Sequence, residues 1–247
     1  MRKVLAVLLS LSLFAFGAAW AQTAALPSLT VTFVENPTTG YTWSVAVSDA
    51  ALLSLTDQGF TAAPGSAEGA AGTHSWMLTG LAEGDATVTF TYAQGWEGGE
   101  GLQPIVYTIH VDAQLQLTVA SVTGYPELYM PDKGAVLLLE NPTTGYQWSY
   151  TLSAEGVLTL ERDAYTAPEV TPGTAGAGGT HLWVFAPAGE GDVTATFVYA
   201  RSWEKDVEPE ATVTYTFHVD ASGAVTLTEM GGDYETYDPL MATATAE

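Results

Sequence analysis

The chain has 247 residues and is strongly acidic, with 28 Asp and Glu against 6 Lys and Arg, a formal charge of −22 and no cysteine. Nucleic acids and anionic membrane surfaces are bound through basic patches, so this charge excludes both as partners. The absence of cysteine excludes disulfides and thiolate metal sites. We therefore expect stability to come from hydrophobic cores, and we expect no cofactor.

The first 21 residues have the pattern of a secretory signal peptide. Met1-Arg2-Lys3 is followed by an apolar run from Val4 to Phe16 and then by Ala19-Trp20-Ala21. A basic start, an apolar run too short to span a bilayer and an A-x-A site are typical of a cleaved signal. We expect a soluble mature protein that is secreted, either extracellular or periplasmic; a retained N-terminal anchor is the alternative.

The heptapeptide Glu35–Tyr41, ENPTTGY, recurs unchanged about 105 residues later as Glu140–Tyr146. A repeat of this length indicates two tandem units, each the size of a domain. Asn-Pro starts a turn, Pro37 restricts its own φ, and Gly40 can adopt a positive φ. We expect a rigid loop that holds Thr38 and Thr39 at its tip with their hydroxyls free to form hydrogen bonds.

Apolar and polar residues alternate along short segments on both sides of each heptapeptide, which predicts half-buried strands. Pro and Gly separate the segments, and no helical period is sustained. The second unit repeats the order and parity of the first. The sequence therefore predicts an all-β protein of two tandem immunoglobulin-like β-sandwich domains. The strands expected in the first unit are 28–35, 41–48, 52–56, 74–80, 86–92, 105–112 and 114–120.

The expected organisation is a signal peptide (1–21), domain 1 (22–121), a linker (122–133), domain 2 (134–230) and a mobile C-terminal tail (231–247). The inward parity of four tryptophans places them in the cores: Trp43, Trp76, Trp148 and Trp183. The four histidines do not have the spacing of a zinc site. His110 and His218 alternate outward and are expected in solvent, whereas His74 and His181 are expected to be structural.

If successive strands run antiparallel, the connections between strands one and two, three and four, and five and six lie at one end of each sandwich. These connections are the Thr-tipped turn, a Gly-rich segment and a loop that contains a tryptophan. Three loops on a rigid scaffold resemble an antibody paratope. The alternatives are an ordinary turn and a tryptophan that folds back on its own sandwich.

Three motifs together resemble the chagasin family of cysteine-peptidase inhibitors: Asn-Pro-Thr-Thr-Gly-Tyr, Gly-x-Gly-Gly-Thr and Arg-x-Trp-Glu. The resemblance covers nearly all of both units and is closest in the second. Ser202 departs from the family's usual Arg-Pro-Trp. In the first unit, Ala71 occupies a common glycine position, and Gln94-Gly95-Trp96 lacks the arginine.

The resemblance implies a monomeric inhibitor that inserts three loops into the active-site cleft of papain-like cysteine peptidases, the first loop approaching the catalytic cysteine. Trp96 and Trp203 are the expected anchors, and Arg201 and Lys205 are expected to support the third loop or to contact the rim. The implied peptidase-binding residues are Asn36, Pro37, Thr38, Thr39, Gly40, Tyr41, Gly72 and Trp96 in the first unit, and Asn141, Pro142, Thr143, Thr144, Gly145, Tyr146, Gly178, Gly179, Arg201 and Trp203 in the second.

Two other classes of function remain open at this stage. An enzyme is disfavoured because the chain contains no G-x-S-x-G, H-E-x-x-H or phosphate-loop motif. A tandem adhesion or glycan-binding module would use the same loops on an immunoglobulin-like scaffold. A third possibility is an inhibitor fold without inhibitory activity, which applies most to the first unit.

Overall fold

The computed structural model describes residues 26–62, 69–94, 103–168, 176 and 178–239. The expected signal peptide, Trp96 and the last residues of the expected tail lie outside these ranges. Within them, no helix is long and apolar enough to cross a membrane.

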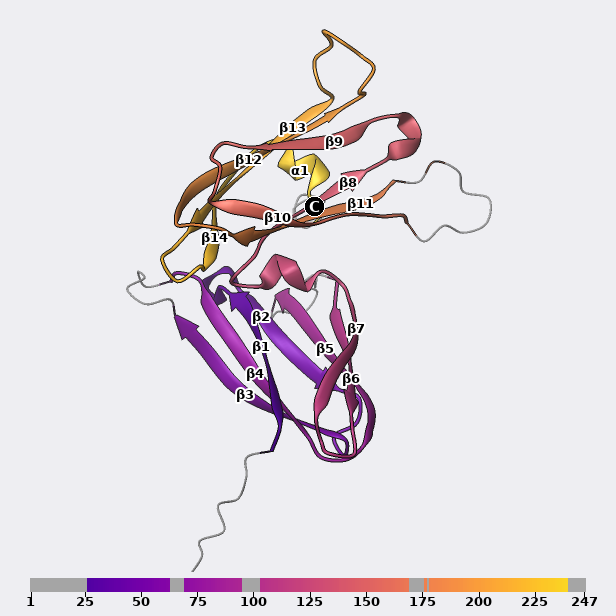
Figure 1. Ribbon diagram of the computed structural model, residues 1–247, viewed down its shortest axis with the longest axis vertical. Helices are drawn as coiled ribbons and strands as arrows, with labels where there is room; N and C mark the ends of the chain where they lie inside the picture. The colour runs from indigo at the N-terminus through magenta and orange to yellow at the C-terminus, as the bar shows by residue number, and fades with distance from the viewer. Residues whose placement is uncertain (1–25, 63–68, 95–102, 169–175, 177, 240–247) are drawn as a thin grey trace, which may run out of the picture.

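Domain 1 is a sandwich of two antiparallel sheets (Figure 1). The three-stranded sheet has the order β1-β4-β3, and the four-stranded sheet has the order β2-β5-β6-β7. A single turn of 3₁₀ helix, η1, joins β1 to β2. The elements are β1 (Ser28–Glu35), η1 (Pro37–Thr39), β2 (Tyr41–Val47), β3 (Leu53–Ala62), β4 (Gly72–Gly80), β5 (Gly84–Gln94), β6 (Ile105–Val111) and β7 (Leu117–Thr123).

Domain 2 repeats this topology, with sheets β10-β11-β8 and β14-β13-β12-β9. The tandem immunoglobulin-like sandwich predicted from the alternation is confirmed. A short 3₁₀ helix, η2, precedes domain 2, and a helical turn, α1, follows its last strand. The elements are η2 (Pro126–Tyr129), β8 (Gly134–Glu140), η3 (Pro142–Thr144), β9 (Gln147–Leu152), β10 (Leu158–Thr166), β11 (Gly179–Pro187), β12 (Gly191–Ala200), β13 (Ala211–Val219), β14 (Val225–Gly232) and α1 (Tyr234–Tyr237).

Two expected strand boundaries were wrong because a turn signal was misread. Asp57 accepts a hydrogen bond from the Gly59 backbone N–H at 2.7 Å, but this local turn is a bulge inside β3, which continues to Ala62. Conversely, Asp112 accepts from the N–H groups of Gln114 and Gln116, both at 2.8 Å. Those residues form a tight turn, and β7 therefore starts at Leu117.

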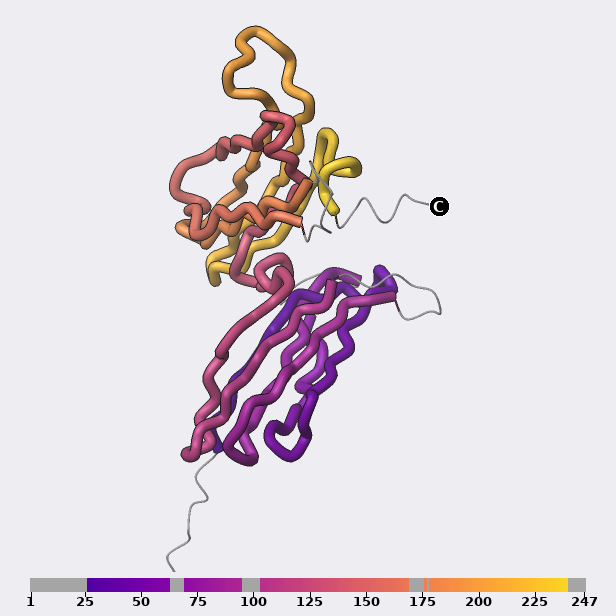
Figure 2. Tube along the Cα trace, turned by 90° about the vertical axis from the view of Figure 1, so that its right-hand side faces the viewer, coloured from indigo at the N-terminus to yellow at the C-terminus, as the bar shows by residue number. Residues whose placement is uncertain are grey.

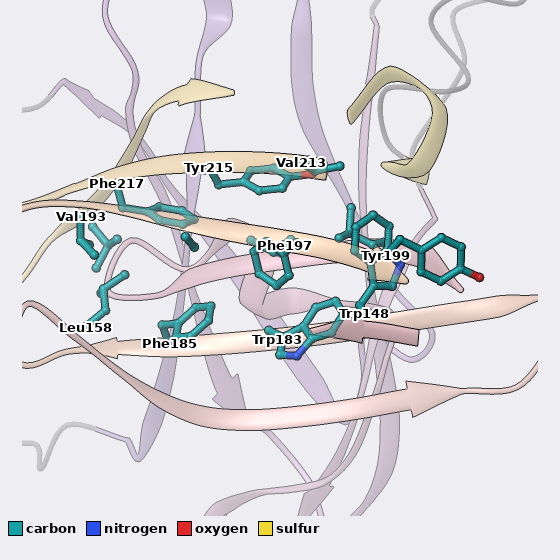
Figure 3. Packing of buried hydrophobic residues seen from close by; sticks show 14 of the residues in the cluster. Trp148, Leu158, Trp183, Phe185, Val193, Phe197, Tyr199, Val213, Tyr215 and Phe217 are labelled. Carbon is teal, nitrogen blue, oxygen red and sulfur yellow. The ribbon is translucent and has the colours of Figure 1, made fainter. Parts of the chain in front are cut away.

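The alternating residues meet between the sheets in a core rich in aromatic side chains. The four tryptophans predicted to be internal are at most 9 % exposed. In domain 2, Trp148 stacks on Tyr199 at 4.7 Å between ring centroids, and Trp183 contacts Phe197 (Figure 3). Domain 1 repeats the first contact between Trp43 and Tyr92, also at 4.7 Å. The tryptophan parity read from the sequence is thus confirmed.

Each sandwich is completed by a tyrosine from the segment that follows its last strand. Tyr129 of η2 lies edge-on against Trp43 at 4.9 Å, and Tyr237 of α1 lies edge-on against Trp148 at 5.3 Å. The two segments share a sequence pattern, because Gly124-x-x-Glu-x-Tyr-x-Pro recurs from Gly232. The residues assigned to a linker and to the start of a tail therefore contribute to the two cores.

The opposite side of η2 contacts domain 2. Leu128 and Tyr125 pack on a small apolar cluster formed by Leu137, Leu182 and Val184 on the outer face of β8 and β11. The Tyr125 hydroxyl lies 2.7 Å from the Thr180 hydroxyl. The tube view shows residues 124–133 between the two domains (Figure 2).

The corresponding outer face of domain 1, on β1 and β4, is polar where the face of domain 2 under η2 is apolar. The paired residues Leu137 and Leu182 correspond to Thr32 and Ser75, whose hydroxyls are 2.9 Å apart. An apolar pair is favourable where another segment covers it, and a hydrogen-bonded polar pair is favourable where solvent reaches it. The difference supports a specific contact between η2 and domain 2.

We predict that Tyr129→Ala lowers the free energy of unfolding of domain 1 by about 2 kcal/mol, because truncating a partly buried aromatic ring that packs on the core leaves a cavity. Tyr237→Ala should do the same to domain 2. Denaturant unfolding followed by tryptophan fluorescence measures both changes. Tyr129→Phe, which keeps the ring, is the control, and unfolding midpoints unchanged by the alanine substitutions would show that neither ring supports its core.

Candidate functional site

Three connections converge at one end of each sandwich, as the antiparallel topology predicts. Strand pairing is antiparallel throughout both sheets, so the connections β1–β2, β3–β4 and β5–β6 leave from the same edge. We name them loops 1, 2 and 3 of head 1, and the corresponding loops of domain 2 form head 2. In Figure 1 loop 1 of head 2, at η3, and loop 3, between β12 and β13, project away from domain 1.

The threonine hydroxyls of loop 1 make the same hydrogen bonds in both heads. The side chain of Asn36 caps η1 and accepts from the Thr38 hydroxyl at 2.7 Å, and the Thr39 hydroxyl donates to the Asn36 carbonyl at 2.7 Å. In head 2, the hydroxyls of Thr143 and Thr144 donate to Asn141 at 2.6 and 2.7 Å. The threonine hydroxyls are therefore engaged inside the loop rather than free, which corrects the expectation. Both threonines of each tip remain exposed.

A glycine ends each 3₁₀ turn in the left-handed region. Gly40 has φ of 82° and Gly145 has φ of 85°, and their N–H groups donate to the carbonyls of Pro37 and Pro142. Asn36 and Asn141 also donate their backbone N–H groups to the Tyr92 and Tyr199 hydroxyls, at 3.3 and 3.0 Å. Loop 1 is thus closed by the glycine at its end and held to its own sandwich at its first residue.

Loop 2 is hydrogen-bonded to loop 1 in both heads. The Thr38 hydroxyl reaches the Gly69 carbonyl at 3.1 Å, and the Asn141 side-chain amide donates to the Gly176 carbonyl at 2.7 Å. Gly72 and Gly179 lie at the buried starts of β4 and β11, where a Cβ would meet a backbone oxygen within about 2.2 Å. Their lack of a side chain lets Phe60 and Tyr165 cover the strand. Gly178 is exposed beside the stem of loop 1.

Loop 3 is joined to loop 1 in head 2 through Arg201. Its Nε donates to the Thr144 carbonyl at 3.2 Å, its guanidinium lies 4.3 Å from the centre of the Tyr146 ring, and a terminal nitrogen pairs with Glu204 at 3.0 Å. The hydrogen bond to Glu204 raises the pKa of Arg201. Gln94 occupies the corresponding position in head 1, and Trp96 lies outside the described residues.

Trp203 rests on loop 1 and is 65 % exposed, and it shares loop 3 with the exposed Val207. A Cβ at Gly145 would lie 2.2 Å from the indole of Trp203. The ring can therefore pack at this position only because residue 145 has no side chain. The ring therefore does not fold back into the sandwich. Lys205, the other base of this loop, is exposed.

Sequence reasoning did not identify the residues that hold the stem of loop 1. Glu35 and Glu140 are 3 and 5 % exposed, and each accepts a hydrogen bond from the backbone N–H of Trp43 or Trp148 on the opposite side of the loop. His74 and His181 bind the same carboxylates. One signal was available, because each glutamate is the first residue of the repeated heptapeptide.

These features define three adjoining loops at one end of each sandwich, and no cluster of metal ligands is found among the described residues. The model of the Chagasin family peptidase inhibitor I42 matches residues 25–111 and again residues 131–219. The chain belongs to the chagasin family of peptidase inhibitors, as two tandem copies of its domain.

Among solved structures, the cysteine protease inhibitor EhICP2 from Entamoeba histolytica is 28 % identical, with a TM-score of 0.32, over 34 % of this chain and 75 % of its own. Domains 5–6 of the S-layer protein SbsC are 11 % identical over 76 % of this chain and 89 % of theirs, with a TM-score of 0.18. A structure titled BspA_C_WT is 9 % identical over 84 % of this chain and 94 % of its own, with a TM-score of 0.22. No curated protein matches the chain.

We predict that Gly145→Ala displaces Trp203 and destabilises head 2 by more than the roughly 1 kcal/mol that a left-handed alanine costs. Gly156 is the matched control, because it has φ of 77° and nothing within 4 Å of a Cβ. Gly156→Ala should therefore show the backbone cost alone. Thermal unfolding and the indole fluorescence of each variant measure the difference, and equal effects would mean that the contact between Gly145 and Trp203 does not matter.

Proposed function

We propose that the chain is a secreted, reversible and non-covalent inhibitor of papain-like cysteine peptidases. Each head would insert its three loops into the active-site cleft, with Thr38 and Thr39, or Thr143 and Thr144, at the leading tip. The observation that carries the proposal is the cross-linking of loop 1 to its neighbouring loops at one end of the sandwich. Family membership supports inhibition of cysteine peptidases as the class of activity.

The mechanism follows from pre-organisation. A loop that is ordered in the free protein loses little conformational entropy on binding, so more of the contact free energy appears as affinity. The hydrogen bonds of Asn141 to both threonines order loop 1 before any partner arrives. Occlusion of a cleft in this way uses no nucleophile and breaks no bond, so inhibition is competitive and reversible.

The exposed indole of Trp203 is the anchor of head 2 in this proposal. A large aromatic ring that is exposed in the free protein and enclosed in a complex has the character of an interface hot spot. Arg201 would hold loop 3 in place beneath it. Head 1 lacks this arginine, so head 2 is the stronger head of the two.

We predict that Trp203→Ala weakens inhibition by head 2 at least tenfold, corresponding to about 1.4 kcal/mol of binding free energy. Steady-state inhibition of a papain-type enzyme measures the change. Val207→Ala is the control within the same loop. Equal inhibition by parent and Trp203→Ala would remove Trp203 from the interface, and no inhibition of any papain-like enzyme by micromolar parent protein would contradict the proposed function itself.

Active-site titration gives the number of peptidases bound by one chain. Two heads would bind two enzymes at saturation if both are competent. Arg201→Gln gives loop 3 of head 2 the residue that head 1 has at this position. We expect it to lower the affinity of head 2 for the peptidase to about that of head 1. If the parent binds one peptidase per chain and the Arg201→Gln variant binds none, all of the binding belongs to head 2.

A further inference from the structure

Each head contains an imidazole ring held between two carboxylates directly beneath its binding loops. In head 1, His74 Nδ1 lies 2.6 Å from Glu35 and His74 Nε2 lies 2.7 Å from Asp57. In head 2, His181 Nδ1 contacts Glu140, and Nε2 lies 2.6 Å from Asp163. We name each set of three residues a clamp.

Each clamp joins the stems of two binding loops. Glu35 ends β1 immediately before loop 1, and its other oxygen accepts from the backbone of Trp43 beyond loop 1. Asp57 lies on β3 before loop 2, and His74 lies on β4 after it. The imidazole therefore connects the base of loop 1 to both strands that carry loop 2, and the same connections recur in domain 2.

With both carboxylates ionised, the geometry requires a charged ring. An ionised carboxylate only accepts hydrogen bonds, so both ring nitrogens must donate, and only the imidazolium has two N–H groups. A neutral ring would direct a lone pair at one carboxylate. Because Glu35 is buried and the Asp57 side chain is 61 % exposed, we expect the contact to Asp57 to be lost on deprotonation.

We propose that His74 and His181 are positioning residues, which as imidazolium ions hold loops 1 and 2 in the peptidase-binding arrangement and make inhibition dependent on pH. The inference rests on the proposed function, because it concerns the affinity of those loops for a peptidase. Neither histidine lies at a loop tip, so neither is expected to contact the peptidase.

The groups that face the imidazoles of His74 and His181 determine whether their pKa values are raised or lowered. Burial alone would lower the pKa of His74 and of His181, but their hydrogen bonds to the two carboxylates outweigh it and raise both pKa values above 6.5. The other faces hold Trp76 in head 1, and Trp183 and Tyr165 in head 2. The hydrogen bond from His74 lowers the pKa of Asp57 below 3.8.

A raised histidine pKa means that the clamp contributes fully below pH 6.5 and is lost as the pH rises through the folded value. A lowered aspartate pKa means that the contribution of Asp57 is lost only as the pH falls through that lowered value. The clamp of head 1 is therefore intact between the lowered pKa of Asp57 and the raised pKa of His74. Inhibition should weaken in alkaline solution.

The experiment compares two double variants of the full chain. His74→Asn with His181→Asn can keep a donor to Glu35 and Glu140 but cannot reach the aspartates or carry charge. The matched control is His110→Asn with His218→Asn, because those rings also pair with aspartates, at 2.8 and 2.7 Å, but at the end of the sandwich remote from the loops. The inhibition constant of each chain is measured against papain from pH 5.5 to 8.5.

The ratio of inhibition constants, variant over parent, cancels the titration of papain itself. We expect the clamp variant to be weaker by about tenfold at pH 5.5, because it loses the charge-assisted hydrogen bond to the aspartate, and we expect the ratio to fall towards one as the pH rises and the parent loses the same bond. The control should match the parent at every pH. A clamp variant that inhibits like the parent throughout, or with a ratio independent of pH, overturns the proposal.

A second measurement does not depend on the peptidase. The chain has four histidines, so the ring ¹⁵N signals of the full protein can be assigned by single substitution. Both ring nitrogens of His74 and His181 should be protonated at pH 6, and a neutral ring at that pH would overturn the proposal. If both rings are charged but the parent inhibits no peptidase, the proposed function fails while the charged clamp stands.

Discussion

A buried carboxylate at the base of each binding loop is the constraint on which the binding end depends. An ionised carboxylate removed from water costs several kcal/mol unless it is paired and hydrogen-bonded. Glu35 and Glu140 meet that requirement with a tryptophan backbone N–H on one oxygen and a histidine ring on the other. Because these partners come from strands on either side of the loops, satisfying the charge also fixes the stems.

Beyond this carboxylate, which both heads share, loops 1 and 3 differ in the hydrogen bonds that fix them. Loop 1 has the same sequence in the two heads and closes on itself through the hydrogen bonds of its threonine hydroxyls to the asparagine, so its shape does not depend on its neighbours alone. Loop 3 is where the heads diverge, since Arg201 reaches loop 1 in head 2 and Gln94 takes its place in head 1. A duplicated domain can in this way keep one tip and vary its affinity through a neighbouring loop.

Much of the fold could be predicted because it depends on local pattern. Alternation gave the strands, the repeat gave two domains, and parity placed the four tryptophans inside, since side chains on a strand point to opposite faces with a period of two. The predictions of strand and domain boundaries were wrong where the same local sequence pattern is compatible with two structures. The turn chemistry of Asp57 to Gly59 produces a bulge within a strand, and the polar segments after Thr123 and Gly232 contribute Tyr129 and Tyr237 to the cores.

The sequence by itself determined the architecture, the antiparallel end at which three loops meet, and the family to which the chain belongs, because these follow from periodicity and from a repeated motif. Only the tertiary structure decided which side chains hold the loops. His74 is 39 residues from Glu35 and 17 residues from Asp57, and the three residues lie on three different strands. Their contact depends on how these strands pair and in which register, and no local pattern in the sequence specifies either.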